Sequence, residues 1–180
     1  MIRHLDIAPG ARIAEVGVAA GDFSQFLLDT LKPSYFLAAD LFEMDRTPVI
    51  WGIPQEELFR GKGHYGYYVS RFADVKGVEV MKGLSHEVMA TVPDGALDLI
   101  YVDAGHDYIS VKQDIDVCVT KVKPDGILVF NDYVLYDPVT QDAYGVVQAV
   151  NELLAAGGWR VLGFALQRHM FCDIALARCP

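Results

Sequence analysis

Short apolar runs alternate with amphipathic helical patterns along most of this chain. The runs have the length and apolar content of buried strands, and the segments between them repeat apolar residues at helical spacing. They lie at 12–16, 35–39, 78–81, 96–102 and 126–130, and two further runs at 159–166 and 170–177 are close enough to pair as an antiparallel hairpin. Strands that alternate with helices are typical of an α/β domain with a mainly parallel sheet. We therefore predict a seven-stranded α/β domain.

Residues that cap or break helices mark the segments between the strands. Asp22 and Gln25 form a capping-box-like start for the first helix, and Ser85 can cap a short helix after the third strand. Apolar periodicity predicts two longer helices, over 111–122 and 146–154. A turn is expected at 123–126, where proline, aspartate and glycine follow one another.

Length and charge narrow the functional classes. The 180 residues suit a single domain that spans positions 1–180. The 24 acidic residues outnumber the 15 Lys and Arg, so the net charge is −9 and a basic footprint for nucleic acid is missing. We also expect no membrane partner and a cytoplasmic location, because neither a signal-peptide core nor an apolar run of ~20 residues is present.

One connection is too long for a simple crossover between strands. Residues 43–76 separate the second predicted strand from the third, and this insertion is rich in glycine and aromatic residues. Two interpretations stand side by side. The segment is either a mobile lid over a ligand, or an extra helix with a glycine-rich turn whose aromatic residues pack.

Acidic residues gather where the predicted strands end. Asp40 closes the second strand, Asp103 the fourth, and Asn131 with Asp132 the fifth. Ligands of open α/β sheets bind outside the carboxyl ends of the strands. Neighbouring carboxylates repel one another, which a hydroxylated or cationic ligand or a metal ion would relieve. The edge is therefore a candidate binding site.

The loop after the first strand contains two glycines, Gly17 and Gly21, that would let the backbone approach a ligand. It is not the Gly-x-Gly-x-x-Gly fingerprint of nicotinamide dinucleotide sites, which makes a nicotinamide-dependent oxidoreductase an unfavoured alternative. Asp40 is placed to accept hydrogen bonds from two ribose hydroxyls. These features favour a nucleoside-containing ligand.

At this point the residues resemble a known family. Glu-x-Gly-x-x-x-Gly at 15–21, the acids Asp40 and Asp103, and Gly-Leu-Ser at 83–85 are similar to class I S-adenosylmethionine-dependent methyltransferases. More narrowly, segments 16–24, 103–108 and 126–133 resemble the macrocin-type sugar O-methyltransferases and their relatives. The resemblance implies a Rossmann-like three-layer α/β/α sandwich, a seven-stranded mainly parallel sheet with an antiparallel carboxy-terminal strand, and S-adenosylmethionine as cofactor.

The same resemblance implies roles for individual residues. The expected cofactor-binding residues are Glu15, Gly17, Val18 and Gly21 at the methionine part, Asp40 at the ribose, Leu41 and Ser85 at the adenine, and also Asp103. In that family an acid at the position of Asp103 and a pair at the positions of Asn131 and Asp132 bind a divalent metal, usually Mg²⁺. Here the first of the pair is Asn, which is still a hard oxygen donor but removes one charge.

Two residues are candidates for the general base. His106 lies three residues after Asp103, and an unperturbed pKa of ~6.5 suits proton abstraction near neutral pH. The alternative is a loop histidine that caps a helix or packs on Tyr108. Asp132 would serve as base where no metal is bound, and His64 is a further histidine to test because it lies in the insertion.

The sequence therefore predicts an enzyme that methylates oxygen on a small hydroxylated metabolite or sugar. One alternative is an N-methyltransferase, and another is a catalytically inactive S-adenosylmethionine-binding protein. The partner expected is a small-molecule acceptor, whose identity the sequence does not give. A homo-oligomer is compatible with the sequence, which does not fix the oligomeric state.

Overall fold

The computed structural model describes residues 1–180, apart from the side chain of His169. One seven-stranded sheet has the order β10-β11-β7-β6-β1-β2-β5. Its strands are β1 (Arg12–Val16), β2 (Tyr35–Asp40), β5 (Val78–Lys82), β6 (Leu97–Val102), β7 (Val122–Phe130), β10 (Trp159–Leu166) and β11 (Cys172–Arg178). Strand β11 is antiparallel to both of its neighbours and the rest are parallel. The predicted Rossmann-like sheet is confirmed.

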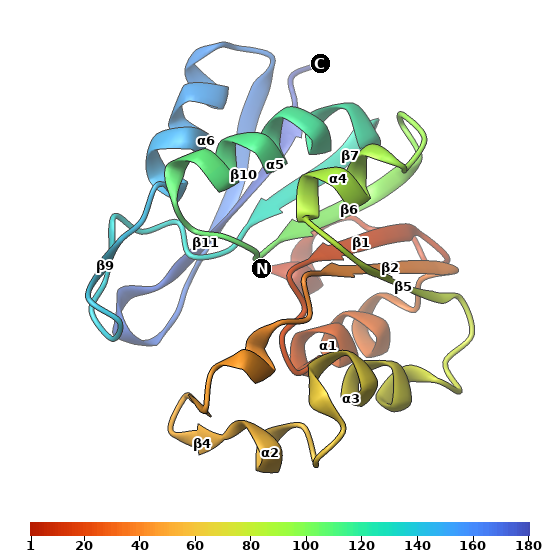
Figure 1. Ribbon diagram of the computed structural model, residues 1–180. Helices are drawn as coiled ribbons and strands as arrows, with labels where there is room; N and C mark the ends of the chain where they lie inside the picture. Colours follow the sequence, from red (N-terminus) through yellow and green to blue (C-terminus); the bar gives the residue numbers. More distant parts are fainter.

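Helices cover both faces of this sheet (Figure 1). On one face lie α1 (Asp22–Leu31) and α3 (Gly63–Phe72), and on the other lie α4 (Ser85–Ala90), α5 (Tyr108–Lys121) and α6 (Val146–Ala155). Side chains of successive residues in the central strands point to opposite faces of the sheet and pack in two separate hydrophobic cores. Ile13 packs under α1, whereas Ala14 packs toward α5. No helix in the described part of the chain is long and apolar enough to cross a membrane.

Three local predictions were wrong. The N-cap of α1 is Gly21, and the side chain of Asp22 makes no cap but lies 2.7 Å from Arg71. The N-cap of α4 is Leu84 rather than Ser85, again without a side-chain cap. Residues 123–126 lie inside β7 rather than in a turn before it, and they form an irregularity in the strand between the pairs Leu97–Val122 and Leu99–Ile127.

The segment 43–76 contains two different structures. Its second half is α3, which crosses from β2 back to β5 and buries Tyr68 and Phe72 in the core. The first half contains short elements that lie outside the sheet in Figure 1, namely η2 (Met44–Arg46), β3 (Val49–Ile50), β4 (Ile53–Pro54) and α2 (Gln55–Leu58). The packing interpretation therefore describes α3. The β3–β4 hairpin stays the candidate lid.

The remaining short elements flank the sheet. They are η1 (Ile2–His4), η3 (Arg168–Met170) and the hairpin of β8 (Tyr136–Asp137) with β9 (Asp142–Ala143), which follows β7. Buried Asp137 holds that hairpin, since its carboxylate accepts hydrogen bonds from Val139 N, Thr140 Oγ1 and Tyr144 Oη. The hairpin lies at the same edge of the sheet as the acidic strand ends, because it leaves β7 just after Asp132.

Candidate active site

A cavity of about 540 Å³ opens at the carboxyl ends of the central strands. Six of the residues predicted from the sequence line it: Gly17, Asp40, Leu41, Ser85, Asp103 and His106. They come from the loops after β1, β2, β5 and β6. The ends of parallel strands meet at one edge, so the predicted convergence of these loops is what the sheet order produces.

Three other predicted cofactor residues lie behind the cavity wall. Glu15 is only 1% exposed and accepts a hydrogen bond from Ser24 Oγ, which in turn accepts one from Tyr68 Oη. Burial raises the pKa of Glu15 well above its usual value. The Val18 side chain is buried in the core, and a Cβ on Gly21 would meet the rings of Phe72 and Tyr68. These residues support the loop after β1 from the side that faces away from the cavity.

Gly17 is required by a close approach between two strand ends. Its φ is +83°, and a Cβ there would lie 1.9 Å from the carbonyl oxygen of Asp103. Any side chain would push the loop after β1 away from the end of β6. The glycine therefore serves the contact between the two loops that form the cavity floor.

The carboxylate of Asp40 joins two walls of the cavity. Its Oδ2 accepts a hydrogen bond of 2.7 Å from Val18 N, and its Oδ1 accepts one of 2.6 Å from Phe42 N. Each carboxylate oxygen retains acceptor capacity for a ligand hydroxyl. Asp40 thus holds the loop after β1 against the segment after β2 while lining the space between them.

Trp51 lines the cavity from the turn of the β3–β4 hairpin, where its φ is +50° and its side chain is 70% exposed. It is one of the aromatic residues of the insertion that the lid interpretation places over a ligand. Other lining residues were not assigned a role from the sequence, among them Glu43 and Met44 after β2, His86 on α4, and Ser110 and Gln113 on α5.

His106 lies between two carboxylates at the end of the cavity. Its Nε2 is 3.5 Å from Asp103 Oδ1 and 3.6 Å from Asp132 Oδ2, and it has no hydrogen bond of ordinary length. The Tyr144 ring stacks on the imidazole at 4.5 Å between centroids, with 13° between the planes. Neither helix capping nor packing on Tyr108 accounts for this position. The structure thus brings together the two residues predicted as candidate bases.

The pKa values of these groups are coupled through the short distances. Burial lowers the pKa of His106, but the nearby carboxylate of Asp103, together with the charge of Asp132, outweighs it and raises the pKa above 6.5. Burial raises the pKa of Asp132 to about 6, against the opposing charge of His106. Asp132 also has a φ of +50°, a conformation that costs a non-glycine residue energy and recurs at functional sites.

A magnesium site built from Asp103, Asn131 and Asp132 does not form. Among the described residues there is no group of three or more His, Cys, Asp and Glu side chains suited to a metal ion. The imidazole of His106 lies between the two carboxylates, where a shared cation would bind. The Asn131 amide nitrogen donates 3.0 Å hydrogen bonds to Tyr101 Oη and to an oxygen of Asp173, which leaves its Oδ1 as the possible donor to a metal. The position of the imidazole is therefore the observation that does not fit the metal.

Asp173 is a site residue that sequence reasoning missed. It lies on β11, is 5% exposed, and accepts hydrogen bonds from Tyr101, Asn131 and Gln167 at 3.2, 3.0 and 2.8 Å. Burial raises its pKa to about 6. The available signal was an acid inside an otherwise apolar strand. Its effect is to fix the Asn131 amide beside His106.

A family comparison assigns this arrangement of strands and loops. The family described as a methyltransferase domain matches residues 14–133, from β1 to the loop after β7. The chain belongs to this family. The match includes every predicted cofactor-binding residue and both candidate bases.

Solved structures share the fold of this methyltransferase domain at low sequence identity. The S-adenosylmethionine dependent methyltransferase from Mesorhizobium loti has a TM-score of 0.65 and 14% identity, over 97% of this chain and 94% of that one. The ribosomal protein L11 methylase from Lactobacillus delbrueckii subsp. bulgaricus has a TM-score of 0.65 and 16% identity, over 99% and 75%. These likenesses extend to the fold and not to the substrate.

A curated protein is also similar to this methyltransferase domain. Uncharacterized protein y4gI from Sinorhizobium fredii (strain NBRC 101917 / NGR234) is 29% identical over 151 residues. The match covers 80% of this chain but 15% of that protein. The domain therefore spans only a small part of the length of this relative.

The cavity residues fit S-adenosylmethionine, the cofactor of this methyltransferase family. The volume of about 540 Å³ lies in the range of small-molecule sites. The acceptor oxygens of Asp40 suit the ribose hydroxyls, and the apolar side chains of Leu41 and Leu84 suit the faces of an adenine ring. Asp40, the predicted ribose-binding residue, and His106, the candidate base, thus line one cavity.

Proposed function

We propose that this domain transfers the methyl group of S-adenosylmethionine to a hydroxyl oxygen of a small hydroxylated molecule, with His106 as the general base. The observation that carries the proposal is that His106 lines the cavity while its Nε2 lies 3.5–3.6 Å from two carboxylates. A small-molecule acceptor agrees with the net charge of −9, which disfavours a polyanionic acceptor.

His106, the two aspartates and the loops of the cavity have different roles in the proposed methyl transfer. S-adenosylmethionine, when bound, supplies an electrophilic methyl group on a positively charged sulfur. His106 would accept the proton of the acceptor hydroxyl as that oxygen takes up the methyl group. Asp103 and Asp132 stabilise the imidazolium that results. The loops after β1 and β6 hold the reacting groups in line, which supplies part of the rate enhancement.

The β3–β4 hairpin is proposed as a lid over this site. Trp51 is 70% exposed at its tip while lining the cavity, so a bound ligand would cover apolar surface that is now open to solvent. The hairpin is joined to the sheet through short irregular segments, whereas α3 is packed in the core. Closing the hairpin would exclude water from the methyl group.

Methyl transfer from labelled S-adenosylmethionine tests the proposal. The acceptor panel contains sugars and other small alcohols, with matched amines in place of the hydroxyl. We expect transfer to at least one alcohol, and His106→Asn should lower its rate at least ~100-fold while S-adenosylhomocysteine binding measured by calorimetry stays within ~3-fold. Transfer to amines alone, with His106→Asn fully active, contradicts the proposal and favours N-methylation.

A further inference from the structure

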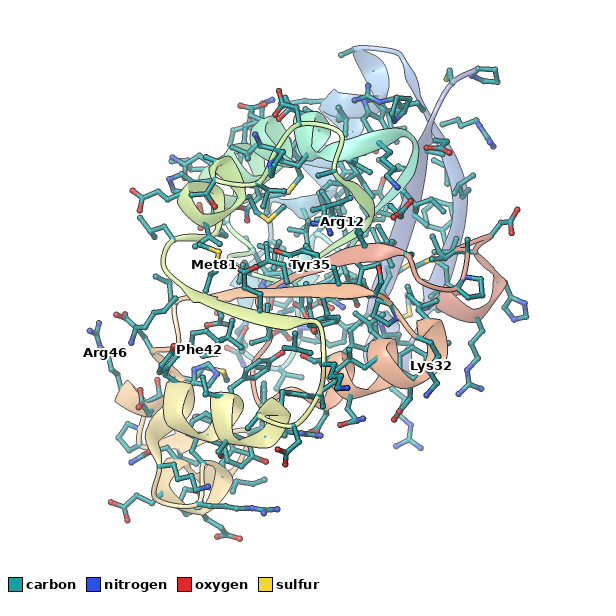
Figure 2. All side chains as sticks on the ribbon, turned by 90° about the vertical axis from the view of Figure 1, so that its right-hand side faces the viewer. Arg12, Lys32, Tyr35, Phe42, Arg46 and Met81 are labelled. Carbon is teal, nitrogen blue, oxygen red and sulfur yellow. The ribbon has the colours of Figure 1, made fainter. Side chains whose placement is uncertain are left out.

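His64 is a buried polar side chain that the proposed chemistry does not use. It lies in the first turn of α3 and is completely buried. The ring stacks on Phe59 at 4.7 Å and meets the edge of Phe42 at 5.0 Å between centroids. Figure 2 shows Phe42 beside α3, at the junction between the sheet and the inserted segment. A histidine in such an apolar site needs partners for both ring nitrogens.

Both ring nitrogens find main-chain partners. Nε2 lies 2.7 Å from the carbonyl oxygen of Ala19, and Nδ1 lies 3.3 Å from the main-chain nitrogen of Met44. A carbonyl can only accept, so Nε2 carries the hydrogen and Nδ1 accepts from the Met44 N–H. The two partners therefore select one neutral tautomer of the imidazole.

The two partners belong to two different segments that line the cavity. Ala19 lies in the loop after β1, with a φ of +45°, and Met44 lies in the segment that leads to the hairpin. Both residues line the cavity. The main-chain nitrogen of His64 also donates to Asp45 Oδ2 at 3.0 Å, which fixes the start of α3 to the same segment. One residue thus connects three stretches of chain behind the cofactor.

We propose that His64 is a positioning residue that couples the cofactor-binding loop to the β3–β4 hairpin. Its Nε2–H holds Ala19 in the left-handed conformation that the cavity requires, and its Nδ1 holds Met44, from which the hairpin extends. Cofactor contact with the loop and placement of Trp51 are then linked events. The proposal rests on the proposed function, since it takes S-adenosylmethionine as the ligand of this cavity.

Three substitutions separate the two hydrogen bonds from the packing. The amide nitrogen of Gln lies near the position of Nε2, the amide oxygen of Asn lies near that of Nδ1, and Phe keeps only the aromatic ring. We expect His64→Phe to weaken S-adenosylhomocysteine binding at least ~10-fold, His64→Asn to weaken it nearly as much, and His64→Gln to stay within ~3-fold. Phe59→Leu is the matched control, because it removes the stacked ring and neither hydrogen bond.

The readouts are calorimetric affinity, the thermal midpoint, and Trp51 fluorescence in a Trp159→Phe background, where Trp51 is the one tryptophan left. Coupling predicts that the cofactor product changes Trp51 emission in the otherwise wild-type protein, but neither in His64→Gln nor in His64→Asn, because each variant keeps only one of the two hydrogen bonds. Equal affinities in all three His64 variants, or a loss of affinity in Phe59→Leu as large as in His64→Phe, overturns the proposal. Failure of the unsubstituted protein to bind S-adenosylhomocysteine instead contradicts the proposed function.

Discussion

The two walls of the cavity are built in different ways. On the side predicted to bind the cofactor, Asp40 and His64 are held by hydrogen bonds to main-chain groups. On the acceptor side, His106 faces Asp103 and Asp132 at distances longer than ordinary hydrogen bonds. A wall with fixed donors and acceptors is suited to binding one ligand in one position. A wall with unsatisfied titratable groups is suited to moving a proton. Substitutions on the two sides should therefore have different consequences.

The largest effect is expected where the two walls meet. Gly17→Ala places a methyl group 1.9 Å from the Asp103 carbonyl at a φ of +83°, so both loops must move. We expect more than ~4 kcal/mol loss in the free energy of unfolding, measured by urea denaturation. Gly10→Ala is the control, since its φ is +80° but nothing lies within 4 Å. Equal losses in the two variants would show that backbone strain, and not the contact between the walls, is decisive.

On the cofactor side, Asp40→Ala removes the ribose acceptor and leaves Val18 N and Phe42 N without their partner. S-adenosylhomocysteine affinity should fall at least ~10-fold, because a hydrogen bond to a charged group contributes ~1.5–3 kcal/mol. Turnover at saturating cofactor should change much less. Unchanged affinity by calorimetry would remove Asp40 from the cofactor site.

On the acceptor side, the rate should depend on pH rather than affinity. Neutral His106 is the active base, and its pKa lies above 6.5, so turnover should rise with pH through a midpoint above 6.5. Asp132→Asn removes a charge that favours the imidazolium, which moves this midpoint to lower pH. The measurement is the pH profile of kcat for both proteins. A midpoint that does not move in Asp132→Asn argues against coupling between the two groups.

The smallest effect is expected from chelation. The His106 imidazole lies between the carboxylates that a divalent ion would need. Turnover with a verified acceptor should stay within ~2-fold after exhaustive treatment with EDTA, and added Mg²⁺ should restore nothing. A large loss that Mg²⁺ reverses would show that His106 moves aside for a metal. The metal, and not His106, would then be the group that activates the acceptor hydroxyl.

The sequence predicted the residues that follow strands and missed those that depend on contacts between distant segments. Asp40, Asp103 and Asp132 were found because the strand ends of a parallel sheet share one edge. Trp51 reaches the cavity only through the path of the inserted segment. The metal prediction is not supported, because the imidazole of His106 lies between the carboxylates of Asp103 and Asp132. The contact between Asn131 and Asp173, 42 residues further along the chain, was likewise not predicted, since no local pattern around Asn131 indicates it.

The position of β11 between β7 and β10 also affects the order in which the sheet can form during synthesis. Strand β11 lies between β7 and β10, so residues 159–178 must leave the exit tunnel before this side of the sheet can close. Strands β1, β2, β5 and β6 are already outside by then, and segments available early can fold first during synthesis. A nascent chain that is still held at β7 has the elements of the cofactor pocket and lacks the Asp173 that orients Asn131. The residues predicted to bind the cofactor therefore leave the ribosome before Asp173 does.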